Sequence, residues 1–225
     1  LCTTTGVTAA ADNEEVVRCC GMVLLAVKPQ VLEAVLLPLK DAWRRDHLLI
    51  SIAAGVTIKR LQSLTRDSLA VARVMPNLLC TVGEAASGVA FSEQVSQRQQ
   101  AWVLKLLGAV GTAVRVEEKL MDAVTALAGS GPAFVALVVE ALADGAVAAG
   151  LPRDQAMTLA AQTVMGTGKY LLQTGEHPGQ LKDRVCSPAG TTIEGVRALE
   201  EGGLRNALID AVLRAARRSQ ELGQS

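Results

Sequence analysis

The sequence changes its pattern at Glu118, and this change constrains the fold more than any other feature. Before it, short apolar runs alternate with segments of helical period, and the run at residues 22–27 (MVLLAV) is typical of a strand covered on both faces. After it, every apolar segment has a helical period. This order predicts an α/β domain with a largely parallel sheet at residues 1–117, followed by an all-helical domain at residues 118–225.

The individual elements follow from the same periods. Further strands are expected at residues 47–52, 70–74 and 112–116. Helices are expected in the first domain at residues 12–19, 30–37, 57–64 and 92–107, with Thr57 as an N-cap residue. In the second domain, helices are expected at residues 120–128, 132–149, 152–173, 191–199 and 203–222, and residues 125–132 (TALAGSGP) indicate a helix break.

The segment at residues 132–149 is apolar on nearly every side of a helix, so it must be buried all round. Half of the chain is hydrophobic but only 2% is aromatic, a composition of Ala, Val and Leu that favours closely packed helices. The uncharged run at residues 123–139 is shorter than the ~20 residues that span a bilayer, and we interpret it as core. A helical unit with such an element needs a partner surface.

Charge and cysteine usage exclude several classes of function. Basic and acidic residues number 22 each, so no bulk field attracts nucleic acid or an anionic membrane, and neither is expected as a partner. The five cysteines form no Cys-x-x-Cys motif and fit no disulfide framework, which indicates a reducing compartment. The two histidines, His47 and His177, cannot anchor a metal site by themselves, so no metal is expected. Nothing resembles a Ser-His-Asp arrangement.

Two loops of the first domain have the features of a nucleotide site. Residues 26–29 (AVKP) place a lysine beyond the carboxyl end of a predicted strand, where open α/β sheets bind their ligands. Residues 52–55 (IAAG) follow the next strand, and their small side chains would let a flat nucleotide approach the backbone. Each loop taken singly is equally an ordinary strand-to-helix connection; together they favour a cofactor. A Gly-x-Gly-x-x-Gly motif does not occur in the 225 residues.

A third candidate site precedes the helix expected at residues 191–199. The segment VCSPAGTT (185–192) would place unpartnered backbone N–H groups at a helix start, and Gly190 would let a ligand come close. This pattern predicts an anion site of the size of a carboxylate. The alternative is that Thr191 and Thr192 are simply N-cap residues.

Six segments, in this order, resemble the pyrroline-5-carboxylate reductase family, and together they cover essentially the whole chain. They are AVKP (26–29), SIAAGVTI (51–58), RVMPN (73–77), GSGPAF (129–134), ADGAVAAGLP (143–152) and LKDRVCSPAGTTIEG (181–195). The last segment is specific to the family. The resemblance implies a Rossmann-like dinucleotide-binding domain, then a helical dimerisation domain that intertwines with a second subunit, with the active site in the cleft between them. It implies NADP or NAD as cofactor and a homodimer that often assembles further.

The resemblance also assigns residues. The substrate loop would comprise Ser187, Gly190, Thr191 and Thr192, with Thr192 as the catalytic residue. The cofactor-contacting positions would be Asn13, Ala26, Val27, Lys28, Pro29, Ile52, Ala53, Ala54 and Glu118. Two departures stand out: Ala189 occupies a position where glycine is common, and Leu-Leu-Cys at residues 78–80 replaces the usual Thr-Pro-small sequence.

The implied activity is the reduction of the cyclic imine 1-pyrroline-5-carboxylate to L-proline with NAD(P)H, the last step of proline biosynthesis, in the cytoplasm or, as the alternative, in mitochondria. The resemblance further implies that about 40 residues, roughly one βαβ unit with the glycine loop, precede Leu1. A strand is then expected near residues 6–10, and residues 22–27 become a sheet edge. Two other hypotheses are a 3-hydroxyacid-type dehydrogenase and an inactive dimerising scaffold. The first needs a lysine in the helix at residues 132–149, which contains none.

Overall fold

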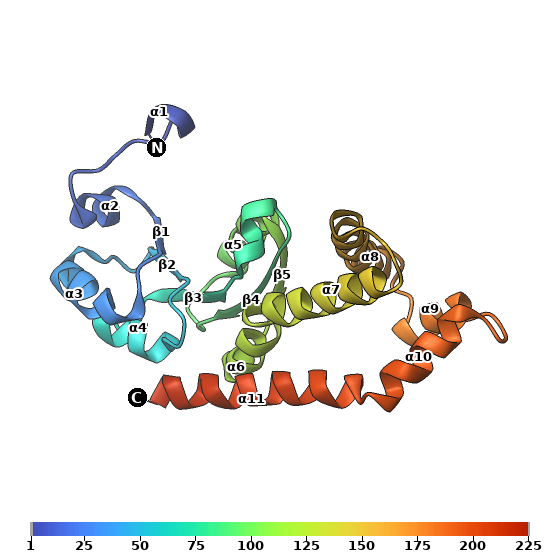
Figure 1. Cartoon of the computed structure of the whole chain (residues 1–225). Helices are drawn as coiled ribbons and strands as arrows, with labels where there is room; N and C mark the ends of the chain where they lie inside the picture. The colour runs from blue at the N-terminus through green and yellow to red at the C-terminus, as the bar shows by residue number, and fades with distance from the viewer. Residues whose placement is uncertain (1, 225) are drawn as a thin grey trace. The chain divides into compact units, whose positions relative to one another are not determined.

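The computed structural model describes residues 2–224 and divides into two compact units (Figure 1). The first comprises the chain up to Ser130 together with the segment from Leu213 onward, and the second comprises Gly131–Val212. The first unit contains a five-stranded sheet in the order β1-β2-β3-β4-β5. All neighbouring strands are parallel except β3 and β4, which are antiparallel. The strands are β1 (Met22–Leu25), β2 (Leu48–Ser51), β3 (Ala70–Met75), β4 (Ala85–Phe91) and β5 (Gly111–Arg115).

Four of these strands lie where the apolar runs predict them. Strands β2 and β3 are buried along nearly their whole length, which a continuous apolar run predicts, whereas β1 and β5 are partly exposed. Strand β4 was not predicted. Its sequence, AASGVAF, is rich in small residues, and a Cβ on Gly88 would lie 2.5 Å from Cγ1 of Val124. Close packing therefore selects glycine there, at the expense of strand propensity. The strand expected near residues 6–10 is wrong, since that segment has no regular structure.

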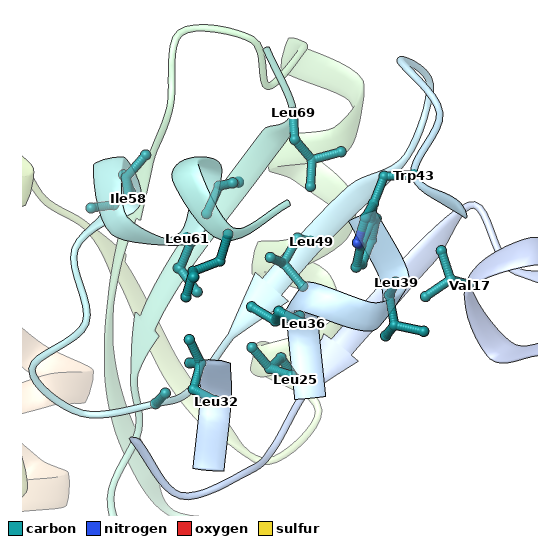
Figure 2. Close-up of a cluster of buried hydrophobic side chains, with 14 of the residues drawn as sticks. Val17, Leu25, Leu32, Leu36, Leu39, Trp43, Leu49, Ile58, Leu61 and Leu69 are labelled. Atoms are coloured by element: carbon teal, nitrogen blue, oxygen red, sulfur yellow. The ribbon is translucent and has the colours of Figure 1, made fainter. Parts of the chain in front are cut away.

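Helices cover both faces of the sheet. One face carries α2 (Asn13–Cys19), α3 (Leu32–Leu36), α4 (Ile58–Leu64) and α6 (Met121–Val124), which bury Val17, Leu36, Leu61 and Met121 with Leu49 and Val71 of the strands; Figure 2 shows much of this cluster. The other face carries α5 (Gln97–Gly108), whose Val103 packs with Ile50 and Val74. The short elements of this unit are α1 (Cys2–Thr5), η1 (Pro29–Val31), η2 (Leu37–Ala42), η3 (Leu78–Val82), η4 (Glu118–Leu120) and the π-helical turn η5 (Thr125–Gly129).

Side-chain caps decide where two helices begin. Thr57 caps α4 by accepting a hydrogen bond from the Arg60 amide at 3.1 Å, which confirms the prediction for Thr57. Helix α5 begins five residues later than the apolar period predicts. Ser96 and Gln99 form a capping box there, while the hydroxyl of Ser92 instead accepts a hydrogen bond from the amide of Val71 in β3.

The second unit is helical throughout its described length. Its elements are α7 (Gly131–Ala148), α8 (Arg153–Thr174), α9 (Pro178–Val185), α10 (Thr191–Glu201) and the first part of α11 (Leu204–Gln224). Helices α7 and α8 pack through Ala143, Ala156 and Ala160, whose small side chains allow a close approach. Helix α9 was not predicted; it begins at Pro178, where His177 caps it by accepting a hydrogen bond from the Gly179 amide.

Helix α7 keeps much of its apolar surface uncovered within one chain. Val135 is 46% exposed, Leu137 is 65% exposed, and only Ala143 is fully buried. Burial on every side, as the sequence predicts, therefore requires a surface beyond the helices of the second unit. By length and composition alone, the helical run Glu118–Ala148 could also cross a membrane, which is weak evidence. Two of its residues, Met121 and Ala126, are buried in the first unit.

Candidate functional site

The carboxyl ends of three parallel strands meet at one edge of the sheet. Leu25 of β1 pairs with Ser51 of β2, which pairs with Arg73 of β3. The backbone N–H of Ile52 donates to the carbonyl oxygen of Leu25 at 3.1 Å, so the loops that follow β1 and β2 start side by side. This edge of an open parallel sheet is where ligands bind. The structure thus brings together the two loops that the sequence analysis proposed for the cofactor.

The first loop carries Ala26, Val27, Lys28 and Pro29. Lys28 is exposed and precedes the 3-10 helix η1, which has no side-chain cap. Within residues 2–224 its ammonium group forms no ion pair, which leaves the charge available for an anionic ligand. Pro29 occupies the first turn of η1, where the absence of an N–H group costs nothing.

The second loop carries Ile52, Ala53 and Ala54. Ala53 is buried, and its amide donates to the hydroxyl oxygen of Ser51 at 3.3 Å. Gly55 has a φ of +76°, a conformation that permits the sharp turn before α4. The amides of Ala54 and Gly55 donate no hydrogen bond within the described chain. These free donors, the small side chains and Lys28 on the neighbouring loop form a donor set that fits the phosphates and hydroxyls of a dinucleotide.

Glu118 reaches this second loop from a distant part of the sequence. Its Oε1 atom accepts a hydrogen bond from the backbone N–H of Ile58 at 2.7 Å and another from Nη1 of Arg73 at 3.1 Å. Ile58 is the first residue of α4, the helix that follows the loop. The structure therefore places Glu118 beside predicted cofactor positions. Sequence reasoning missed Arg73 as its partner, although an arginine inside the apolar run AVARVM was a usable signal.

A third loop follows β3 at the same edge and is organised by Asn77. The side-chain amide of Asn77 donates from Nδ2 to the carbonyl oxygen of Ala128 at 3.0 Å. Its Oδ1 atom accepts from the amides of Leu79 and Ala86 at 3.2 and 3.3 Å. Asn77 was noted only as part of the RVMPN segment, because its contact with Ala128 joins residues 51 positions apart in the sequence. The segment at residues 78–80, where Leu-Leu-Cys differs from the usual family sequence, follows directly and is exposed to solvent; Leu78 is 75% exposed.

Asn13 is not joined to these loops by any hydrogen bond or ion pair in the described residues. It is the exposed first residue of α2, and the capping of that helix is done by its neighbour Asp12, whose carboxylate accepts from the Glu15 amide at 2.8 Å. The assignment of Asn13 to the cofactor remains a prediction.

The predicted substrate loop lies in the second unit and contains a tight turn. Ser187-Pro188-Ala189-Gly190 is closed by a hydrogen bond from the Gly190 amide to the Ser187 carbonyl oxygen at 3.0 Å. Proline in the second position and a φ of +55° at Ala189 in the third are typical of a type II turn. A Cβ on Gly190 would lie 2.2 Å from Oγ of Ser187, so a side chain at this position would require the Ser187 hydroxyl to move.

The turn leads directly into α10, and this helix start has no side-chain cap. Gly190 occupies the N-cap position, while Thr191 and Thr192 are the first two helical residues. The alternative that these threonines are N-caps is therefore wrong. Their hydroxyl groups make no hydrogen bond within the described part of the chain. The free amides, the two hydroxyls and the helix dipole together suit a carboxylate.

The start of this loop is held by Arg184 of α9. Its Nη2 atom donates to the hydroxyl of Tyr170 at 2.7 Å and to the carboxylate of Glu176 at 2.9 Å, and its guanidinium lies over the Tyr170 ring. The hydrogen bond to Tyr170, followed by the charge of Glu176, raises the pKa of Arg184 above its ordinary value. Arg184, in the exposed last turn of α9, thus ties this helix to the end of α8. Among residues 2–224, no group of three or more potential metal ligands occurs.

Comparison with known proteins gives consistent results for both units. The family model for pyrroline-5-carboxylate reductase dimerisation matches residues 118–222, and the model for NADP oxidoreductase, coenzyme F420-dependent, matches residues 1–55. A pyrroline-5-carboxylate reductase from Methanosarcina acetivorans is 52% identical over 219 residues, which cover 97% of this chain and 81% of that protein. The enzyme from Pisum sativum is 46% identical, covering 96% of this chain and 79% of that protein.

Solved structures agree with the curated relatives. The structure of a pyrroline-5-carboxylate reductase from Coxiella burnetii has a TM-score of 0.94 and 34% identity, covering 98% of this chain and 83% of that one. The structure of the Plasmodium falciparum enzyme with NADP bound has a TM-score of 0.84 and 32% identity, covering 97% of this chain and 83% of that one.

Proposed function

We propose that this chain, which belongs to the pyrroline-5-carboxylate reductase family, uses its two groups of site residues in one reaction. The loops of the first unit hold the cofactor, and the start of α10 holds the substrate. The protein is an oxidoreductase that reduces 1-pyrroline-5-carboxylate to L-proline with NAD(P)H, in proline biosynthesis. The predicted family, fold class, activity and cofactor are thereby confirmed. The high identity over nearly the whole chain favours this enzyme over a 3-hydroxyacid-type dehydrogenase.

The observation that carries the division of labour is the uncapped start of α10. A carboxylate placed there would accept hydrogen bonds from the amides of Thr191 and Thr192 and would satisfy donors that otherwise lack partners. The Ser187 turn fixes Gly190 as the N-cap, which keeps the approach free of a side chain. The hydroxyl of Thr192, half-buried and unpartnered, would position the imine ring.

The chemistry requires little from the protein beyond this positioning. A protonated cyclic imine is already an electrophile, and NAD(P)H, when bound, supplies the hydride. The new C–H bond forms at the imine carbon, and the electron pair of the C=N bond moves to the nitrogen, which keeps its proton. No strong general acid is needed. In this proposal the loops at residues 26–29 and 52–57, together with Glu118, hold the cofactor.

The proposed assembly is a homodimer that associates further. Support comes from the match to the dimerisation family model and from the exposed apolar side chains of α7. The proposed location is the cytoplasm, supported by the free thiols of Cys19, Cys20, Cys80 and Cys186, which suit a reducing compartment. We propose no nucleic-acid or membrane partner, in line with the balanced charge of 22 basic and 22 acidic residues.

The role of Thr192 is tested by steady-state kinetics with 1-pyrroline-5-carboxylate and NADPH. Thr192→Ala should lower kcat/KM by an amount equivalent to about 1–3 kcal/mol of transition-state binding. Thr163→Ala is the matched control, because the Thr163 hydroxyl only donates to the Leu159 carbonyl oxygen within α8. Unchanged kinetics in a correctly folded Thr192→Ala variant would refute the assignment.

A further inference from the structure

Arg73 is a buried charge in an otherwise apolar strand. It is 8% exposed and lies between Val71 and Met75 on the sheet face that packs against α4. Removal of a guanidinium from water is costly, and a buried ion pair adds little net stability compared with well-packed apolar side chains. A methionine at this position would serve the core at least as well. The presence of arginine therefore calls for a role other than stability.

The contacts of Arg73 lead to the cofactor loop through one carboxylate oxygen. Oε1 of Glu118 accepts from Arg73 Nη1 at 3.1 Å and from the Ile58 amide at 2.7 Å. The Ile58 amide is one of the orphan donors at the start of α4, and the cap residue Thr57 does not serve it, because the Thr57 hydroxyl accepts from Arg60 instead. Glu118 is thus the acceptor that completes this helix start.

The loop between Ser51 and Ile58 is consequently held at both ends. At its beginning the Ala53 amide donates to the Ser51 hydroxyl, and at its end the Ile58 amide donates to Glu118. Arg73 restrains the second of these contacts, because its guanidinium donates to Glu118 from β3, where Arg73 is paired with Ser51 of β2. The guanidinium of Arg73 and the amide of Ile58 both donate to Oε1 of Glu118, so the two contacts together restrain this oxygen.

We propose that Arg73 is a positioning residue that acts through Glu118 to hold the loop at residues 52–57 in the shape that binds the nicotinamide cofactor. The proposal rests on the proposed function of that loop. It requires no contact between Arg73 and the cofactor. Arg60, on α4 itself, provides the contrast: it pairs with Glu33 at 2.7 Å, but both side chains are more than half exposed, so this pair orders little.

The test compares Arg73→Met with wild type and with the matched control Arg60→Met in the intact chain. In the cofactor-free protein, Arg73→Met should speed amide exchange at residues 52–58, whereas Arg60→Met should leave it unchanged. The Kd for NADPH from fluorescence titration, and the KM for NADPH, should rise about tenfold in Arg73→Met, equivalent to about 1.4 kcal/mol. The kcat and the KM for 1-pyrroline-5-carboxylate should stay within about twofold.

A double-mutant cycle shows whether the effect passes through Glu118. If it does, Arg73→Met combined with Glu118→Gln should weaken NADPH binding no more than the stronger single substitution; additive effects would overturn the proposal. Should Arg73→Met not fold, Arg73→Lys takes its place in the same cycle. Equal exchange and equal NADPH affinity in Arg73→Met and wild type would refute only the role of Arg73. Absence of NADPH binding by the wild type would refute the function assigned to the loop.

Discussion

Ala189 is the one described non-glycine residue with a positive φ, and this predicts that Ala189→Gly stabilises the protein. The left-handed conformation costs an L-residue roughly 1–2 kcal/mol, because Cβ crowds the following carbonyl oxygen. Glycine removes this strain but adds conformational freedom to the unfolded chain, which takes back about 0.4–1 kcal/mol. The net gain expected is about 0.5–1 kcal/mol in the free energy of unfolding. The turn is closed by the Gly190 amide, so the substitution leaves its hydrogen bond in place.

The gain is measurable as a rise in Tm of about 1–3 °C for a chain of this size. Protein concentration must be held constant, because association shifts the apparent Tm. Ala161→Gly is the matched control, since Ala161 is exposed in the interior of α8, where glycine should lower the free energy of unfolding by about 0.5–1 kcal/mol. An equal loss of Tm in both variants would show that Ala189 is not strained and would refute the reasoning.

Three other predictions concern assembly, pH and the cofactor charge. Leu137→Asp, on the exposed face of α7, should bury an unpaired charge in the proposed interface and yield monomers by sedimentation, whereas a monomeric wild type would contradict the dimer. Burial, with a smaller contribution from Arg44, holds the pKa of His47 below its ordinary 6.5, so the unfolded chain binds the proton first. The stabilising contribution of neutral His47 is therefore complete above pH 6.5 and decreases as the pH falls from 6.5 toward the lowered pKa; urea unfolding of His47→Gln should show a flatter pH dependence, and an identical slope would contradict this. Lys28→Met should raise the KM for NADPH about five- to tenfold and reduce its salt dependence, and an unchanged KM would remove Lys28 from the site.

The elements predicted correctly are those that are determined by the residues within them rather than by contacts with distant parts of the chain. Strands β2 and β3 are buried along nearly their whole length, and β1 at the sheet edge has the same apolar composition, so all three sequences stand out without any structural information. Strand β4 was missed because its sequence is poor in strand-forming residues. Gly88 is required there by the close packing of Val124, which follows 36 positions later in the chain. Apart from α9, the helices of the second unit were found from their period, since proline and glycine mark several of their ends.

The cofactor loops were predicted for a similar reason. The position of residues that directly follow a strand is set by that strand. Because β1 and β2 are parallel, the loops that follow them meet at the same edge of the sheet. The chemical roles of these residues came from the resemblance to the reductase family, because the hydrophobic pattern predicts secondary structure and not chemistry. The structure decided the remaining alternative at the substrate loop, where Gly190 and not a threonine occupies the cap position.

What sequence reasoning could not find is the pair of hydrogen bonds to Glu118 at the end of the second loop, because each joins residues far apart in the chain. Glu118 and Ile58 are 60 positions apart, and Glu118 and Arg73 are 45 apart. Taken alone, Glu118 is an ordinary acidic residue in the first turn of a helix, where the helix dipole favours a negative charge. Arg73 is the more informative of the two, because an arginine at an inward position of a buried strand must have a partner. A search for that partner among the acidic residues at element ends would have reduced the choice to a few carboxylates, and the structure selects the one that also completes the start of α4.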